Sequence, residues 1–392
     1  MERLPRAEGG RVVSAWSRRL ATLCVVLIST TVALGLGELV LRALVNPGDF
    51  LVAKLIDDPV LGQRIAPHTT GHDALGLRNV ALPAQANVVV LGDSQTYGVG
   101  VPREASWPHQ LALLMREPVY SMALGGYGPL EYLHLGTHEA RKLRPRLLLV
   151  GFYFGNDLAE ACRVAHQRPY WKSWREESAG VVCDAEDPAG AAAEPKKRFA
   201  GLRDWLARHS VLYSMARVTV LAPLAAREKD RMAADLPADR QWIWKDPANP
   251  VVRTIFTPQL RLAAIDPNLA HVREGLRVAK RALAMLKDDA DARGARFLVV
   301  LIPTKEAAYC RPLQSAGESL PSALLKLCEA EERVKADLIK SLAARNIAYV
   351  DAKPDLEEQV RRHVQIYPSD ADGHPGASGH AVIARAVYNN VR

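Results

Sequence analysis

Four apolar residues in a row, Val88 to Leu91, lead directly into the tripeptide Gly92-Asp93-Ser94. Three of the four are β-branched, which is typical of a short strand buried on both faces of a parallel sheet. Ser94 would then stand at the carboxyl edge of that sheet, where open α/β sheets bind ligands. A serine there can be a nucleophile, or the tripeptide can be an ordinary turn that ends the strand. The choice depends on what the rest of the chain supplies.

An uncharged and mostly apolar stretch covers residues 20–37, and its 18 residues approach the length of a transmembrane helix. Basic residues outnumber acidic ones in front of it, which favours a cytoplasmic N-terminus. A cleaved signal peptide is the alternative, but the stretch is long for one and no clear Ala-x-Ala site follows. We therefore expect a basic cytoplasmic tail over 1–19 and a single-pass anchor over 20–45 in the inner membrane. The rest of the chain would be extracytoplasmic or periplasmic.

The net charge of +8 is spread along the 392 residues rather than concentrated in a basic tract with interleaved aromatic residues. Nucleic-acid binding therefore has little support. The apolar content of 48% is ordinary for a globular protein with a sizeable core.

Five cysteines occur, and Cys24 lies within the apolar stretch. The other four fall in the exported part, where an oxidising compartment permits disulfides. The pairs nearest in sequence are Cys162–Cys183 and Cys310–Cys328, although three connectivities are possible and free thiols are the alternative. Neither a Cys-x-x-Cys motif nor a His/Cys cluster suggests zinc, so we expect no metal site.

Apolar runs and amphipathic segments alternate after a connector rich in Pro, Gly and His over 46–85. The expected strands cover 87–91, 119–124, 147–152, 297–302 and 348–351. The expected helices cover 106–115, 130–142, 267–293, 322–344 and a last segment from about 378. This alternation predicts an α/β fold with a parallel sheet, right-handed crossovers and helices on both faces. We expect one domain over 86–392 to contain all of these strands and helices.

An insertion at about 158–265 interrupts that alternation. It contains a charged loop rich in Pro, Ala and Gly over 184–197. It also contains five of the seven tryptophans, namely Trp171, Trp174, Trp205, Trp242 and Trp244. The insertion could be a lid that grips substrate, or a small subdomain that uses tryptophan in its core, and both interpretations stay open.

Polar residues suited to acyl transfer follow the expected strands. This chemistry needs a hydroxyl nucleophile, a base that takes its proton and an acid that orients the base. Donors aimed at the developing oxyanion contribute roughly 3–4 kcal/mol each. The N–H groups of Ser94 and Gly126 and the side-chain amide of Asn156 could provide them. A histidine and an aspartate from residues 369–380 could act as base and acid.

The motifs in this order resemble the blocks of the SGNH/GDSL hydrolase family, in its membrane-anchored bacterial type. The matching segments are Gly92-Asp93-Ser94, residues 121–126, Gly155-Asn156-Asp157 and residues 372–380. The resemblance covers about residues 85–157 and 295–392. It implies a three-layer α/β/α domain with a five-stranded parallel sheet of flavodoxin-like architecture. It also implies that no metal or organic cofactor is needed.

The resemblance implies a role for each residue of the site. Ser94 would be the nucleophile, His374 the base and Asp372 the acid. The oxyanion hole would consist of Ser94, Gly126 and Asn156. Asp370 is a reserve candidate for the acid, and His380 is a reserve candidate for the base.

Two departures from the family pattern concern these roles. Ser121 stands where the second block usually begins with asparagine, so the local hydrogen bonds there can differ. Ala371 stands three residues before His374, where the family often has its acid, whereas Asp372 is two residues before. Asp372 is chosen because many membrane-anchored relatives carry a similar Asp-Gly-His form.

Other polar residues near the strand ends receive supporting interpretations. We expect Asp93 to brace the turn before Ser94, and Asp157 to be a helix N-cap rather than a second acid. Lys305 and Glu306 would face the same edge as a solvated ion pair, with substrate contact as the alternative.

The sequence thus predicts a serine-dependent ester hydrolase. Its substrates would be O-acyl esters, such as acetyl esters, of envelope or secreted carbohydrate, which the family and the expected location suggest. The alternatives are an O-acyltransferase with the same triad, or a catalytically weak carbohydrate-binding or assembly factor. Expected partners are an acylated carbohydrate or small ester, the membrane and, as a further possibility, polysaccharide-synthesis machinery.

Overall fold

The computed structural model describes residues 15–175, 181–183, 200–221 and 237–391, and these residues contain a five-stranded parallel sheet. The strands are β3 (Val88–Gly92), β4 (Val119–Ala123), β5 (Leu147–Tyr153), β8 (Arg296–Ile302) and β9 (Ala348–Asp351). Their order across the sheet is β4-β3-β5-β8-β9, and each neighbouring pair is parallel. The expected α/β class and five-stranded parallel sheet are therefore confirmed.

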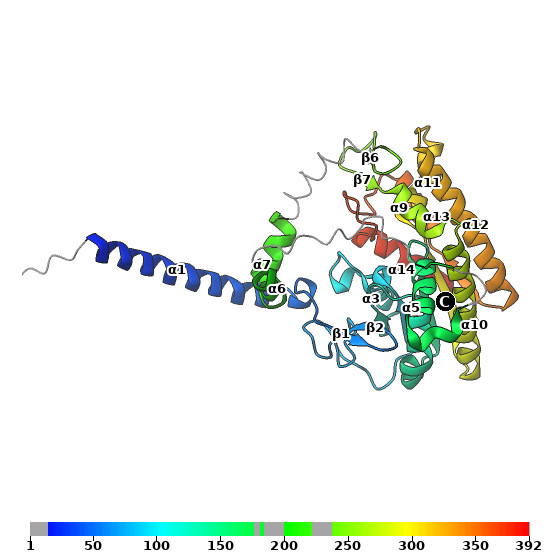
Figure 1. Ribbon diagram of the computed structural model, residues 1–392, viewed down its shortest axis with the longest axis horizontal. Coiled ribbons are helices and arrows are strands. Elements are labelled where there is room, and N and C mark those ends of the chain that lie inside the picture. The colour runs from blue at the N-terminus through cyan, green and yellow to red at the C-terminus, as the bar shows by residue number, and fades with distance from the viewer. Residues whose placement is uncertain (1–14, 176–180, 184–199, 222–236, 392) are drawn as a thin grey trace, which may run out of the picture.

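Helices cover both faces of the sheet (Figure 1). One face carries α3 (Trp107–Met115), α11 (Lys305–Ser315), α13 (Lys353–Arg361) and α14 (Ala377–Val391). The other carries α4 (Pro129–His134), α5 (Asp157–Gln167), α10 (Ala270–Ala292) and α12 (Ser322–Ala344). Because successive side chains of a strand point to opposite faces, Val88 and Val90 pack into the first core and Val89 and Leu91 into the second.

The strand order places the end of β3 at a special position. In chain order the sheet reads 2-1-3-4-5, the flavodoxin-like arrangement, and the chain leaves β3 toward β4 on one side and later returns to β5 on the other. The crevice at such a switch point is where open α/β sheets bind ligands. Ser94 follows β3 after one residue, Asp93, and is the first residue of the short helix α2 (Ser94–Tyr97).

The connector over 46–85 packs onto this domain. It contains η1 (Pro47–Asp49) and an antiparallel hairpin of β1 (Leu55–Asp58) and β2 (Gly62–Ile65). Leu61, Ile65 and Leu77 are buried in the core on the α4/α10 face. The guanidinium of Arg78 is buried too, and its Nη2 donates to Asp49 Oδ1 at 2.8 Å. Short helical turns η2 (Arg103–Ala105), η3 (Leu135–Glu139) and η4 (Ala140–Leu143) complete this half of the domain.

The insertion at about 158–265 contributes buried residues to both cores and also contains elements outside the central sheet. After α5 come η5 (Pro169–Trp174), α6 (Ala200–His209), α7 (Val211–Ala216), η6 (Arg217–Leu221), β6 (Trp242–Lys245), β7 (Arg253–Phe256) and α9 (Pro258–Ile265). Trp171, Trp174 and Trp244 are buried in the two cores, whereas Trp205 is 56% exposed. The three buried tryptophans therefore stabilise the fold rather than line a lid. The charged loop over 184–197 lies outside the described residues.

A 30-residue helix, α1 (Ala15–Leu44), precedes the domain and extends away from it (Figure 1). It is long and apolar enough to cross a membrane, and its apolar side chains are exposed. The four cysteines after it form the two disulfides between sequence neighbours. Cys162–Cys183 attaches the chain around residue 183 to α5, and Cys310–Cys328 joins α11 to α12.

Candidate active site

Ser94 is held in a turn that its neighbour Asp93 caps. The side chain of Asp93 is fully buried, and its Oδ1 accepts a hydrogen bond from the main-chain N–H of Gln95 at 2.9 Å. This is the N-cap of α2, so Asp93 braces the turn. Ser94 Oγ lies 3.5 Å from Asp93 Oδ2, a long hydrogen bond.

Two glycines on neighbouring strands make room for the next residues of this turn. Gly92 of β3 pairs with Gly151 of β5. A Cβ atom at Gly92 would lie 2.1 Å from Thr96 Oγ1, and one at Gly151 would lie 2.3 Å from the same atom. Any larger residue at either position would displace Thr96 and with it the helix that begins at Ser94. The glycine before Asp93 is thus a packing requirement of the turn.

His374 and Asp372 form a hydrogen-bonded pair in the loop that precedes α14. The two atoms His374 Nδ1 and Asp372 Oδ1 are 2.6 Å apart, and the main-chain N–H of His374 donates to the same oxygen at 3.0 Å. Burial opposes ionisation of Asp372, but these hydrogen bonds and the histidine charge outweigh it and lower the pKa of the carboxyl. With Nδ1 bound to the carboxylate, Nε2 is the ring nitrogen that can accept a proton.

The two reserve candidates occupy different environments. Asp370 Oδ1 accepts the main-chain N–H of Asp372 at 2.9 Å, so this carboxylate shapes the loop. His380 is fully buried, and its Nδ1 accepts the main-chain N–H of Trp107 at 3.3 Å. Burial lowers the pKa of His380 to about 3, which keeps the ring neutral. This histidine belongs to the contact between α14 and α3.

The loop of His374 and the turn of Ser94 are in contact with each other. Gln95 Nε2 donates to the carbonyl oxygen of Gly373 at 3.4 Å, and a Cβ at Gly100 would lie 3.9 Å from Asp372 Oδ2. Among the described residues no hydrogen bond joins Ser94 to His374. Catalytic hydrogen bonds are often long in the absence of substrate and tighten when it binds.

The turn that follows β4 passes beside Ser94 at Gly125. The N–H of Tyr127 donates to the carbonyl of Leu124, and Gly126 between them has a φ of 82°, as a type II turn requires. A Cβ at Gly125 would lie 3.6 Å from Ser94 Cβ. Within the described part of the chain, the N–H groups of Gly125 and Gly126 make no hydrogen bond. The sequence predicts Gly126 as an oxyanion donor, and that role stays a prediction.

Asn156 stands at the N-cap of α5, after β5, and its side chain lowers the pKa of the Asp93 carboxyl, against the effect of burial. Its Oδ1 is buried and has no partner among the described residues. The amide of the third strand end thus acts electrostatically on the turn of the serine. A side-chain amide has two N–H donors, which is the kind of group that can bind a developing oxyanion.

Asp157, next in the chain, is fully buried beneath this cluster. It accepts hydrogen bonds from the hydroxyl of Tyr132 at 2.8 Å and the main-chain N–H of Tyr153 at 3.0 Å. The expectation that it caps a helix is wrong, because Asn156 holds the N-cap position and Asp157 binds other elements. Burial, with the charge of Asp93 added, raises the pKa of Asp157 well above its ordinary value. Burial also raises the pKa of Asp93 to about 6.

Lys305 and Glu306 are not a solvated ion pair, because both side chains are fully buried. Lys305 Nζ donates to the carbonyl oxygens of Ile255 at 2.6 Å, Asp370 at 3.0 Å and Asp372 at 3.0 Å. Burial lowers the pKa of Lys305 to about 8. Glu306 Oε1 accepts the main-chain N–H of Thr257 at 3.0 Å. The lysine thus ties β7 to the loop that carries the Asp372–His374 pair.

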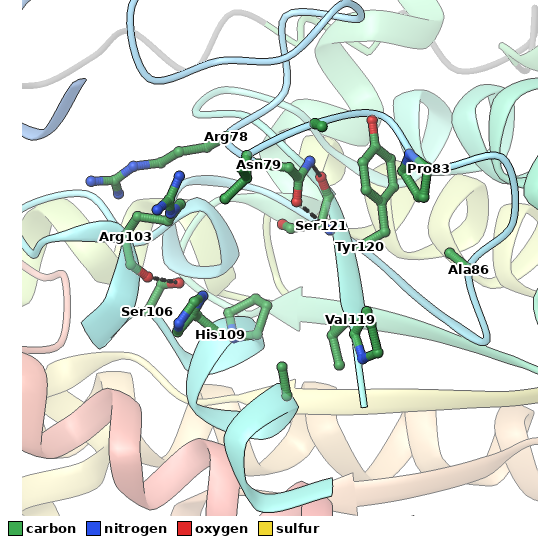
Figure 2. Close-up of a pocket in the computed structure, with 15 residues that line it drawn as sticks. Arg78, Asn79, Pro83, Ala86, Arg103, Ser106, His109, Val119, Tyr120 and Ser121 are labelled. Atoms are coloured by element: carbon green, nitrogen blue, oxygen red, sulfur yellow. Dashed lines mark hydrogen bonds between the residues drawn. The ribbon is translucent and has the colours of Figure 1, made fainter. Parts of the chain in front are cut away.

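A pocket of about 260 Å³ lies outside this cluster, between the connector and the edge strand β4 (Figure 2). Figure 2 shows the side-chain amide of Asn79 beside Ser121, where Nδ2 donates to the Ser121 carbonyl at 2.9 Å and Oδ1 accepts its N–H at 3.0 Å. Asn79 therefore covers the free edge of β4. This pocket does not include Ser94 or His374 among its lining residues.

No family model and no curated protein matches the sequence. Among solved structures, a catalytic mutant of Axe2, an acetylxylan esterase from Geobacillus stearothermophilus, is 8% identical with a TM-score of 0.37, and the match covers 79% of this chain and 94% of that one. A GDSL-like lipase from Bacteroides thetaiotaomicron is 10% identical with a TM-score of 0.34, covering 79% and 91%. Solved SGNH/GDSL hydrolases are thus among the structures similar to this chain. Any role proposed for a residue of this chain therefore rests on the geometry of this chain.

Proposed function

We propose that this protein is a serine-dependent ester hydrolase of the SGNH/GDSL type, with Ser94 as nucleophile, His374 as base and Asp372 as the acid that orients the base. The observation that carries the proposal is the 2.6 Å contact between His374 Nδ1 and Asp372 Oδ1, in a loop that contacts the turn of Ser94. Ser94 itself follows β3 at the switch point of the sheet. A paired base and a strand-end serine are the parts that acyl transfer requires.

In the reaction, His374 Nε2 takes the proton of Ser94 as Oγ forms a bond to the carbonyl carbon of the ester. The negative charge on the carbonyl oxygen is stabilised by the main-chain N–H groups of Ser94 and Gly126 and by the amide of Asn156. The alcohol then leaves with the proton from His374. A water molecule, deprotonated by the same Nε2, attacks the acyl-enzyme, and the acid product and free Ser94 are released.

Water access favours hydrolysis over transfer. Among the described residues, the side chains of His374 and Asp372 are 24% and 38% exposed, which supports access of water to this pair. An O-acyltransferase must keep water away from that intermediate. A catalytically weak carbohydrate-binding or assembly factor would not need the His374–Asp372 pair at all.

The finer proposal is that the substrate is an O-acyl ester, such as an acetyl ester, of envelope or secreted carbohydrate. The two disulfides support an oxidising location, outside the cytoplasm. The helix α1 supports a single-pass anchor in the inner membrane, with the domain over 86–392 on the extracytoplasmic or periplasmic side. An exported, anchored enzyme would meet acylated polysaccharide there, together with the machinery that makes it.

The test compares p-nitrophenyl acetate hydrolysis by the full chain in detergent micelles with that of Ser94→Ala. We expect the variant to lose activity by about 10³-fold or more while its circular dichroism stays unchanged. Equal activity in both proteins would exclude the serine mechanism. Activity in neither, on this ester and on an O-acetylated polysaccharide, would favour the binding factor or a transferase that needs its own acceptor.

A further inference from the structure

The helices α6 and α7 are attached to the C-terminal end of α1. Glu38 of α1 accepts the main-chain N–H groups of Val211 and Leu212 at 2.9 Å each and the hydroxyl of Ser210 at 2.9 Å. A carboxylate at this place satisfies the free N–H groups at the start of α7 and complements its dipole. Figure 1 shows α7 beside the end of α1, running across the direction of that helix.

The C-terminal end of α6 is attached to α1 by a basic residue. Arg42 Nη2 donates to the carbonyl oxygen of His209, the last residue of α6, at 2.5 Å. Arg42 Nε also donates to Glu38 Oε1 at 2.8 Å. A cation therefore meets the C-terminus of one helix and an anion meets the N-terminus of the next. Glu38 and Arg42, the charged residues of the second half of α1, are both used by this contact.

The sequence of α1 indicates how deep in the membrane this contact would lie. The uncharged stretch over 20–37 spans roughly 27 Å at 1.5 Å per residue, close to the thickness of the hydrocarbon core. Glu38 comes immediately after it and so would lie where hydrocarbon gives way to headgroups. A helix that binds Glu38 through its own N-terminus and runs across α1 would lie in that boundary.

The side chains on α6, α7 and η6 suit that boundary. Leu202 and Trp205 are each 56% exposed, and Val218 and Val220 are 52% and 53% exposed. Tryptophan is enriched at the interface between hydrocarbon and water. Exposed basic residues, Arg203 and Arg208, accompany them on α6 and complement anionic lipid headgroups.

We propose that residues 200–221 form a second membrane contact, in which α6, α7 and η6 lie in the headgroup boundary of the bilayer that α1 spans. The lipid partner is argued from the continuity of these helices with α1 through Glu38 and Arg42. The domain is then held at two places on the membrane rather than by a single helix. Leu202, Trp205, Val218 and Val220 are the residues in contact with lipid.

The experiment uses the full chain in liposomes of phosphatidylcholine and phosphatidylglycerol. Cys24 is the cysteine outside the two disulfides, so a Cys24→Ala background allows one NBD fluorophore to be placed at Leu202→Cys or Val218→Cys. Val251→Cys, 85% exposed in the β6–β7 turn, is the matched aqueous control. Val32→Cys, in the middle of α1, is the control for deep insertion. Lipids with spin labels near the headgroup or deep in the acyl chain report the depth.

We expect quenching at 202 and 218 to be at least twofold stronger with the shallow spin label than with the deep one, and a blue-shifted NBD emission. The Val251 probe stays unquenched, and the Val32 probe is quenched by the deep label. If 202 and 218 behave like 251 while 32 is quenched, α1 is inserted and the second contact does not exist. If none of the four probes is quenched, the anchoring by α1 fails and this inference fails with it.

Discussion

The buried ammonium group of Lys305 lies 3.0 Å from the main-chain carbonyl oxygen of Asp372, the residue whose side chain binds His374. The same group also binds the carbonyl oxygens of Asp370 and Ile255. Three donors of one lysine are thus used by three carbonyls from two segments. We infer that Lys305 is a positioning residue, which holds the Asp372–His374 loop against β7 without itself touching the reacting atoms.

The pH dependence of activity tests this role of Lys305. Its pKa is about 8, and above that pH the neutral amine has two N–H donors for three carbonyls. We expect kcat/KM for p-nitrophenyl acetate, measured from pH 6 to 10 against Ser94→Ala as blank, to fall as the pH rises through about 8. Lys305→Arg stays charged and should move that fall to higher pH. If wild type and Lys305→Arg had the same pH profile, the positioning role of Lys305 would be contradicted. Lys142→Arg, at an exposed position, is the matched control.

The identity of the acid is tested by two neighbouring carboxylates. Asp372→Asn removes the acceptor that orients His374 Nδ1, so we expect kcat to fall by about 10²–10⁴-fold. Asp370→Asn keeps an oxygen that can accept the N–H of Asp372, so we expect a fall of less than about tenfold. Steady-state kinetics with p-nitrophenyl acetate provide the comparison. The reverse order would assign the acid to Asp370.

The identity of the base is tested by a pair of histidine variants. His374→Gln should lower kcat by about 10³-fold or more with little change in thermal stability, since the ring is partly exposed. His380→Gln should leave kcat within about threefold but lower the melting temperature, because the buried ring accepts the N–H of Trp107. Loss of kcat in the well-folded His380 variant alone would transfer the base to that residue.

The buried carboxyl of Asp93 predicts a pH-dependent stability. Its pKa rises from 3.8 to about 6 on folding, so the folded state holds the proton more tightly than the unfolded chain. The stabilisation that the protonated Asp93 carboxyl gives the folded state is full below about pH 4 and is lost as the pH rises through about 6. Relative to wild type, Asp93→Asn should therefore gain unfolding free energy between pH 4 and 7 in urea titrations. The exposed Asp288→Asn should show no such trend, and a flat difference for Asp93→Asn would refute the pKa shift.

The attachment of α6 and α7 to α1 predicts a change in protease sensitivity. Glu38→Ala removes the partner of Ser210, Val211 and Leu212, so the helices should separate from α1 more often. We expect trypsin to cleave after Arg203 and Arg208 at least fivefold faster in the variant reconstituted in liposomes. Glu139→Ala, which removes a partner of Lys142 on the domain surface, should leave those rates unchanged. Equal rates in wild type and Glu38→Ala would show that Glu38 does not hold these helices.

Local patterns in the sequence predicted most of the sheet. The runs at 88–91 and 297–302 are strands because β-branched residues fill a pleated surface buried on both sides, whatever their neighbours are. The helix at 322–344 was predicted with the bounds that the structure has, because its apolar positions recur with the helical period. The short helix α11 was not predicted, since its first turn is polar and it contains Pro312.

The candidate site also contains residues that the sequence predicted and neighbours that it did not. Ser94, Asn156 and His374 could be proposed because each lies at a strand end or in a short motif that a reader can recognise. The proximity of Gly125 to Ser94 could not be predicted, because it depends on how the turn after β4 folds back toward α2. Trp171, Trp174 and Trp244 could not be assigned to core or lid until their packing was known.

The sequence by itself determined which segments become strands and helices, and that Ser94 follows a strand, because these properties depend on periodicity and turn chemistry within a few residues. Only the tertiary structure decided that Lys305 is buried against the His374 loop and that Glu38 caps a helix more than 170 residues away. A charged side chain looks solvated in sequence, since its burial becomes stable only when distant carbonyls or N–H groups surround it. Which distant groups meet is a property of the packed chain.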